Sequence, residues 1–311
     1  MKPALLLVAP IHAPTQARLE SDYRVMRWYD APDRAALIER AATEARVAVT
    51  SGGAGMKAEL IDALPRLELI ACFGVGVDAI DLAAARARGI RVTNTPDVLT
   101  DDVADLALGL ILATVRRIVA ADRYVREGRW LKGPMPLTGR MKGTRLGIVG
   151  MGRIGQAIAH RAAAFGMDIA YFGPHPKPVP WRYEPDLVAL ARESGVLAVA
   201  CPGGESTRGL IDRTVLDALG PAGILVNIAR GSVVDEDALV AALTSGRLGG
   251  AGLDVFADEP RVPAALLALD NVVLQPHQGS ATHATRGAMG QLVLDNVEAF
   301  FAGRPLPTPV T

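Results

Sequence analysis

Cysteine is scarce in this sequence, with only Cys72 and Cys201 among 311 residues. Each lies in or just after an apolar run, which favours buried thiols in a reducing compartment over a disulfide or a metal-binding pair. The sequence therefore predicts no metal site and no disulfide framework.

A surplus of one charge is also missing. The 33 Lys and Arg residues balance 33 Asp and Glu residues, and the formal net charge is +0. A surface that binds the phosphate backbone of a nucleic acid needs an excess of basic residues, so no nucleic-acid partner is expected.

Long hydrophobic runs are absent as well. The run LLLVA before Pro10 is shorter than the apolar core of a signal peptide, which has about 7–15 residues. The longest run, at 106–115, lies between Asp105 and Arg116 and cannot cross a bilayer of about 30 Å. The sequence predicts a cytoplasmic protein without a membrane partner.

What the chain does contain is a regular alternation of strand and helix patterns. Its length suggests two domains, because one core rarely serves more than about 250–300 residues. The first series predicts strands at 4–9, 46–50, 67–73 and 90–94 and helices at 34–44, 56–64 and 80–89. A long helix is predicted at 100–128, followed by six strands at 144–150, 167–172, 196–201, 223–229, 250–255 and 271–276, and a last helix at about 284–302. We therefore expect an α/β fold of two Rossmann-like, doubly wound parallel-sheet domains with a cleft between them.

A glycine motif opens the second series. Gly150, Gly152 and Gly155 have GxGxxG spacing, directly after the apolar strand RLGIV and at the start of an Ala-rich helix. In that context, the first glycine permits a tight turn, the second lets a pyrophosphate approach, and the third lets helix and strand pack closely. The motif predicts a dinucleotide site at the helix N-terminus, where Arg153 and Ile154 follow Gly152. The alternative is a glycine turn that binds nothing.

The acid that normally accompanies this motif is missing. An Asp or Glu about 20 residues on would hold the adenosine ribose of NAD, but AYFGPHPKP (170–178) contains neither. Gly173, Pro174, His175 and Lys177 offer donors and positive charge to a 2′-phosphate instead. Asp168 begins the preceding strand and so lies at the wrong end of the sheet. We predict that NADP(H) is preferred over NAD(H), with an ordinary solvated loop as the alternative.

Five ordered segments suggest a family. They are FGVGVDAIDL (73–82), NTPDVLTDDVADLALGL (94–110), VNIARGSVVDEDAL (226–239), LDVFADEP (253–260) and LQPHQGSATH (274–283). With them, nearly the whole chain resembles the D-isomer-specific 2-hydroxyacid dehydrogenases. Within this family it is most similar to the glyoxylate/hydroxypyruvate reductase and hydroxyphenylpyruvate reductase branch, on the first two segments and the Gly-Pro-His-Pro-Lys run (173–177). The resemblance implies NADPH-dependent reduction of a small 2-oxo acid to the D-2-hydroxy acid. It also implies a substrate-binding, flavodoxin-like domain at 1–96 and 283–311 and an NADP(H)-binding domain at 97–282.

The resemblance also implies a catalytic triad. Arg230 would bind the substrate, and His277, paired with Glu259, would act as acid and base. A guanidinium fork suits a carboxylate beside a ketone, an imidazolium can supply a proton near neutral pH, and a neighbouring carboxylate favours the charged imidazole. Singly, each of these residues could be structural.

Further roles follow from the same match. Backbone N–H groups of Val75 and Gly76 would hold the substrate carboxylate. The remaining implied cofactor contacts are Cys201 and Pro202 under the adenosine, and Thr207, Ile228, Ala229, Asp254, His277 and Gly279 around the nicotinamide. Gln278 and the pair Ala257–Asp258 depart from the common pattern, and we expect Asp258 to be solvated and inert. Phe73, Met56, Trp130 and the 135–137 loop are expected to shape the substrate pocket.

The long helix from Thr100 and the resemblance both favour a homodimer. An NAD-dependent phosphoglycerate-type dehydrogenase and a nucleotide-sensing corepressor-like protein of the same fold are the alternative functions. The sequence does not say which 2-oxo acid is the substrate.

Overall fold

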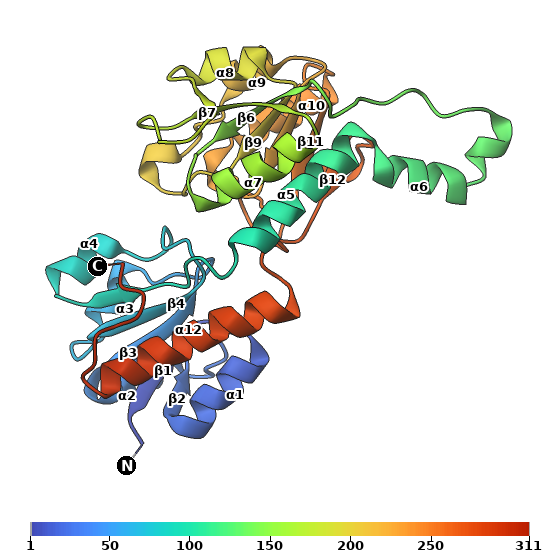
Figure 1. Ribbon diagram of the computed structural model, residues 1–311. Coiled ribbons are helices and arrows are strands. Elements are labelled where there is room, and N and C mark those ends of the chain that lie inside the picture. Colours follow the sequence, from blue (N-terminus) through green and yellow to red (C-terminus); the bar gives the residue numbers. More distant parts are fainter. Residues whose placement is uncertain (1, 311) are drawn as a thin grey trace. The chain divides into compact units, whose positions relative to one another are not determined.

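The computed structural model describes residues 2–310, which form two compact α/β units (Figure 1). The first unit contains the residues up to Leu99 and those from Ala281 onward, and the second runs from Thr100 to Ser280. These divisions lie a few residues from the expected boundaries at 96/97 and 282/283. Each unit has its own buried apolar cluster. The predicted class of two parallel-sheet α/β domains is confirmed.

The first unit is a parallel sheet with helices on both faces. Its strands are β1 (Ala4–Leu7), β2 (Arg24–Arg27), β3 (Val47–Ser51), β4 (Leu69–Phe73) and β5 (Arg91–Thr93). Its helices are α1 (Ala13–Asp22), α2 (Arg34–Glu44), α3 (Ala58–Asp62), α4 (Leu82–Ala87) and α12 (His283–Phe301). The strand order is β2-β1-β3-β4-β5. Because the order reverses at β1, right-handed crossovers place α1 on the opposite face from α2.

Local signals explain most of this unit. Asp33 caps α2 by accepting a hydrogen bond from the Ala36 N–H at 3.0 Å, as the predicted helix start requires. β1 and β4 are buried along their whole length, which is typical of strands covered on both faces. α1 and β2 were not predicted: β2 is only four residues long, and Met26 is its one buried side chain, so its pattern is too short and polar to stand out.

The C-terminal helix α12 packs against α1 in the same unit. Gly290 makes this possible, since a Cβ there would lie 1.9 Å from the Thr15 Oγ1 atom. Tyr23 and Phe301 stack with ring centroids 5.3 Å apart at the ends of the two helices. The C-terminal segment therefore completes the first unit.

The second unit contains a seven-stranded parallel sheet. Its strands are β6 (Arg145–Val149), β7 (Asp168–Phe172), β8 (Arg182–Tyr183), β9 (Val196–Val199), β10 (Ile224–Asn227), β11 (Gly250–Leu253) and β12 (Val272–Leu274). Its α-helices are α5 (Thr100–Val115), α6 (Ile118–Arg126), α7 (Arg153–Ala164), α8 (Leu187–Glu193), α9 (Arg213–Leu219), α10 (Glu236–Thr244) and α11 (Ala264–Leu267). Short 3-10 helices η1 (Arg129–Lys132), η2 (Glu205–Thr207) and η3 (Gly231–Val233) complete it. All six predicted strands are confirmed, and only the two-residue edge strand β8 was missed.

The strand order β12-β11-β10-β9-β6-β7-β8 is the Rossmann order with one added strand. From β6 the chain first moves to β7 and β8 on one side and then returns to β9 on the other. The sheet therefore has its topological switch point between β6 and β9, where ligands of such sheets bind.

The predicted helix at 100–128 is wrong in its length. It breaks after α5, where Arg117 adopts a left-handed conformation with φ 51°, and continues as α6. α5 is buried against β10 and β11, whereas α6 has no buried residue. The helix ends where it leaves the sheet that supports it, and α6 and η1 project from the rest of this unit (Figure 1).

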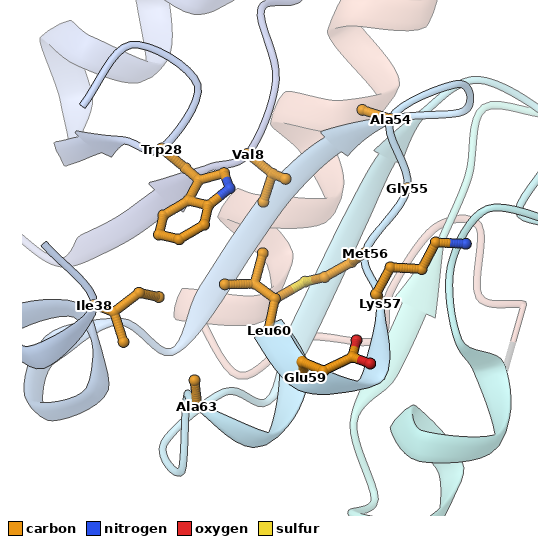
Figure 2. Close-up of a pocket in the computed structure, with 10 residues that line it drawn as sticks. All are labelled: Val8, Trp28, Ile38, Ala54, Gly55, Met56, Lys57, Glu59, Leu60 and Ala63. Atoms are coloured by element: carbon orange, nitrogen blue, oxygen red, sulfur yellow. The ribbon is translucent and has the colours of Figure 1, made fainter. Parts of the chain in front are cut away.

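A pocket of about 380 Å³ lies within the first unit (Figure 2). Its walls come from the carboxyl ends of β1, β2 and β3 and from α2 and α3, with Trp28, Ile38, Met56 and Leu60 among its apolar side chains. Met56, expected to shape a substrate pocket, lines this one. None of the residues predicted to be catalytic or to bind cofactor does so.

Candidate active site

The glycine turn between β6 and α7 has the geometry that its spacing predicts. Gly150 has φ 100°, and a Cβ there would lie 2.6 Å from the Cys201 nitrogen, so no other residue fits between the ends of β6 and β9. A Cβ on Gly155 would lie 2.1 Å from the Gly150 carbonyl oxygen, which explains the close packing of helix on strand. Around Gly152, by contrast, the space within 4 Å of a Cβ is open.

This arrangement fits the phosphates of a dinucleotide. Gly152 is the N-cap residue of α7, and Arg153 and Ile154 begin the helix. The first N–H groups of a helix have no partner within it and carry the positive end of its dipole. The open space at Gly152 lies beside these donors, so an anion can approach them without a steric barrier.

The loop after β7 is held by two tyrosines. The Tyr171 hydroxyl accepts a hydrogen bond from the Lys177 N–H at 2.7 Å, and the Tyr183 hydroxyl donates one to the Gly173 carbonyl at 2.9 Å. His175 and Lys177 are exposed, and within residues 2–310 neither forms an ion pair. Asp168, at the start of β7, pairs with Arg145 at 2.6 Å and lies at the other end of the strand.

The turn after β9 faces the glycine turn. Burial raises the pKa of the Cys201 thiol to about 11, so this thiol stays neutral. The Thr207 hydroxyl donates a hydrogen bond to the Pro202 carbonyl at 2.7 Å and thereby closes the turn. Both cysteines are free thiols.

Arg230 is positioned by a residue that the sequence analysis missed. Asn227, the last residue of β10, is 1% exposed. Its side chain donates a hydrogen bond to the Arg230 carbonyl at 2.9 Å and accepts one from the Ala229 N–H at 3.0 Å. These two bonds fix the path of Ile228, Ala229 and Arg230. A polar residue that ends an apolar strand, as in ILVN, is the signal that could have identified it.

Glu259 and His277 form a direct pair. The His277 Nδ1 atom lies 2.7 Å from the Glu259 Oε2 atom, and the other Glu259 oxygen accepts a hydrogen bond from the Phe256 N–H at 3.1 Å. Burial acts to raise the pKa of Glu259, but the hydrogen bond and charge of His277, the Phe256 N–H and the charge of Arg230 outweigh it and lower this pKa. Glu259 is therefore a carboxylate at neutral pH.

Asp254 holds the loop that carries the histidine. His277 has a left-handed φ of 56°, which is uncommon for a residue other than glycine. The Asp254 carboxylate accepts hydrogen bonds from the Gln278 N–H at 2.6 Å and the Gly279 N–H at 2.8 Å, and its carbonyl accepts one from the His277 N–H at 2.9 Å. Burial raises the pKa of Asp254, against the effect of these donors. A Cβ on Gly279 would lie 3.1 Å from this carboxylate.

Asp258, the acid that precedes Glu259, is not part of the Glu259–His277 pair. Asp258 is exposed and pairs with Arg261 at 2.7 Å, which lowers the pKa of its carboxyl.

In the described part of the chain, no group of His, Cys, Asp or Glu side chains could hold a metal ion. No helix within residues 2–310 is long and apolar enough to cross a membrane.

Val75 and Gly76 follow β4 in the first unit. Both are partly buried, and Gly74 before them has φ 153°, with a Cβ position 3.3 Å from Gly52. The loop is thus packed against the loop after β3.

A Rossmann-type unit with a glycine turn at its switch point and a hydrogen-bonded histidine–glutamate pair is typical of a nucleotide-dependent oxidoreductase. Residues 108–279 match the D-isomer specific 2-hydroxyacid dehydrogenase, NAD binding domain, and the chain belongs to this family. The family resemblance inferred from the motifs is confirmed.

Curated relatives match over nearly the whole chain. A glyoxylate/hydroxypyruvate reductase A of Arabidopsis thaliana and a hydroxyphenylpyruvate reductase of Plectranthus scutellarioides are each 50% identical over 307 residues, covering 98% of this chain and 98% of the relative. Among solved structures, an NADPH-dependent glyoxylate/hydroxypyruvate reductase of Sinorhizobium meliloti, in complex with NADP and malonate, is 44% identical with a TM-score of 0.93. The match covers 100% of this chain and 97% of that one.

Proposed function

We propose that this protein reduces a small 2-oxo acid of the glyoxylate or hydroxypyruvate type to the D-2-hydroxy acid, with NADPH preferred over NADH. The observation that carries the proposal is the Glu259–His277 pair, with 2.7 Å between Oε2 and Nδ1, in the unit that contains the glycine turn. The names of the relatives support the substrate class.

The second unit would hold the cofactor. Gly150, Gly152, Arg153, Ile154 and Gly155 would surround the pyrophosphate, because the open space at Gly152 borders the N-terminus of α7, where the helix dipole favours an anion. The remaining proposed contacts are Gly173, Pro174, His175 and Lys177 at the adenosine ribose, Cys201, Pro202 and Thr207 along the turn after β9, and Ile228, Ala229, Asp254, His277 and Gly279 near the nicotinamide. When bound, the reduced nicotinamide supplies the hydride for the carbonyl carbon.

The protein's own groups would bind the acid and move the proton. Val75 and Gly76 in the first unit would hold the substrate carboxylate through their N–H groups, and Arg230 would bind the carboxylate and the ketone oxygen. His277 would donate a proton from Nε2 to the carbonyl oxygen, since its Nδ1 faces Glu259. In the oxidative direction, the neutral imidazole would remove the hydroxyl proton.

Wild-type protein tests this proposal directly. Mixed with glyoxylate or hydroxypyruvate and NADPH, it should consume NADPH, visible as falling absorbance, and form a D-2-hydroxy acid. A corepressor-like protein would turn over feebly or not at all, and a phosphoglycerate-type dehydrogenase would favour NADH.

The cofactor preference has its own prediction. Lys177→Ala should lower the preference for NADPH over NADH by about tenfold, because a charge-assisted hydrogen bond to the 2′-phosphate would be lost. The measurement is kcat/KM with each cofactor at saturating oxo acid. Lys142→Ala is the matched control, because Lys142 is also exposed but precedes β6 at the amino end of the sheet. A wild-type ratio that favours NADH would overturn the preference.

The projecting segment of the second unit supports a homodimer. Trp130, Leu131 and Leu137 are 68%, 94% and 99% exposed, and Ile118 and Val125 on α6 are also exposed. Large apolar side chains gathered on one projecting segment are typical of a surface that a partner covers. We propose that a second copy of the chain covers it.

A further inference from the structure

The C-terminal tail lies along the open edge of the first unit's sheet. β5 is the last strand in the order, and Thr93 forms an antiparallel bridge with Pro309 beside it. The Val310 N–H donates to the Val92 carbonyl at 2.7 Å, and the Asn94 N–H donates to the Thr308 carbonyl at 3.4 Å. The tail thus covers an edge that would otherwise expose unpaired backbone groups.

Thr308 joins this tail to α12 and to Asn94. Its hydroxyl donates a hydrogen bond to the Asn94 carbonyl at 2.6 Å and accepts one from the Asn296 amide nitrogen at 2.8 Å. Asn296, on α12, is 1% exposed, and its side-chain oxygen accepts a bond from the Thr308 N–H at 3.3 Å. Thr308 therefore has a fixed position between a buried amide and the end of β5.

Asn94 in turn holds the loop after β4. Its side-chain nitrogen donates a hydrogen bond to the Val75 carbonyl at 2.8 Å. The neighbouring carbonyls are also engaged: Gly74 accepts from the Thr95 N–H at 3.0 Å, and Gly76 accepts from the Cys72 Sγ atom at 3.6 Å. Three consecutive carbonyl groups of the loop are thus bound by β4 and the segment after β5.

This pattern determines where the loop's N–H groups point. In a trans peptide, the N–H of one residue points opposite to the carbonyl of the residue before it. The Gly74–Val75 and Val75–Gly76 peptides are trans, so the Val75 and Gly76 N–H groups face away from Asn94 and Thr95. Within residues 2–310, no protein acceptor binds either of these N–H groups. They form a pair of free donors on one side of the loop.

We propose that Asn94 is a positioning residue for substrate binding, and that Thr308 of the C-terminal tail holds Asn94 in place. By fixing the Val75 carbonyl, Asn94 keeps the Gly76 N–H aimed at the carboxylate of the 2-oxo acid. Without that bond, the Val75–Gly76 peptide can rotate, and one of the two donors is lost from the carboxylate site. The inference rests on the proposed function, since it assigns the loop to that substrate.

The kinetic test separates oxo-acid binding from cofactor binding. Asn94→Ala should raise the KM for glyoxylate by about three- to tenfold and leave the KM for NADPH unchanged. Thr308→Val should give a smaller increase of the same kind, whereas Thr308→Ser, which keeps the hydroxyl, should behave as wild type. Asn271→Ala is the matched control, because the Asn271 amide also binds a backbone carbonyl, that of Gly249, in the other unit. Equal increases in both KM values, or no increase in Asn94→Ala, would overturn the inference.

A second measurement does not depend on turnover. In ¹H–¹⁵N spectra of the full chain, the Val75 and Gly76 resonances should shift in Asn94→Ala and Thr308→Val but not in Thr308→Ser or Asn271→Ala. Added oxalate, an unreactive dicarboxylate, should shift both resonances in wild type. If the variants shift them and oxalate does not, the positioning role stands and the proposed carboxylate site fails. If the variants leave them in place, the positioning role fails.

Discussion

Replacing His277 with alanine should lower kcat for 2-oxo acid reduction by about 10³-fold, since a positioned general acid contributes about 10²–10⁴-fold to such a step. The Glu259 carboxylate holds the imidazole directly, with 2.7 Å between Oε2 and Nδ1. NADPH affinity should change far less, because the proposed phosphate and adenosine contacts lie on other loops. Steady-state kcat and fluorescence titration with NADPH measure the two effects.

The matched control for this variant is His160→Ala. His160 lies on the exposed face of α7 and contacts the Trp181 ring edge-on, with centroids 4.7 Å apart. Its loss should leave kcat within about twofold of wild type, as surface substitutions usually do. If His277→Ala kept wild-type kcat, another group would have to supply the proton.

Arg230→Ala should have the second largest effect, a loss of about 10²–10³ in kcat/KM for the oxo acid. Removing one member of a hydrogen-bonded charge pair costs about 2–5 kcal/mol, or about 30- to 5,000-fold, and the expected loss lies in the middle of that range. Arg230→Lys should recover only part of the loss, because an ammonium group cannot present the planar fork that binds carboxylate and ketone together. Titration of both variants with glyoxylate at saturating NADPH gives the values.

Arg261→Ala is the control for the arginine variants. Arg261 is exposed and pairs with Asp258 rather than with Glu259. Its removal should leave kcat/KM near the wild-type value. An Arg230→Lys variant as active as wild type would show that a positive charge alone suffices and that the fork geometry is unnecessary.

A clear periodicity of apolar residues, with capping and turn residues at the ends of helices and strands, made most of the fold predictable. Apolar strands such as RLGIV, and helices capped by residues such as Asp33, carry their signals within a few positions. The break between α5 and α6 was not predictable, because the helical pattern continues through Arg117 and only the loss of a supporting sheet ends the helix. β8 was missed because two residues on a sheet edge have no period to detect.

The candidate site, like the fold, was predictable only in part. Short motifs predicted Arg230, Glu259 and His277 as site residues, and the predicted pairing of Glu259 with His277 agrees with the geometry. The residues that hold these groups were only partly anticipated: Asn227, which fixes the Arg230 backbone, and Asn94, which fixes the Val75 carbonyl, were not predicted, and Asp254 was predicted as a cofactor contact but not as the residue that binds the loop after His277. Asn94 and Asp254 act on backbone groups about 20 residues away in sequence, and such contacts leave no local pattern, whereas Asn227 acts on the next three residues and its only signal is a polar residue at the end of an apolar strand.

We propose that the ionised carboxylate of Glu259, paired with His277, supports the role of His277 as the proton donor. The most direct test is the dependence of kcat on pH for wild type and Glu259→Gln, with Asp258→Asn as control for the adjacent exposed acid. A carboxylate stabilises the imidazolium, so its loss should let the proton dissociate at lower pH. We predict that the pH above which reduction slows moves downward in Glu259→Gln and not in Asp258→Asn. An unchanged upper limit in Glu259→Gln would contradict the claim.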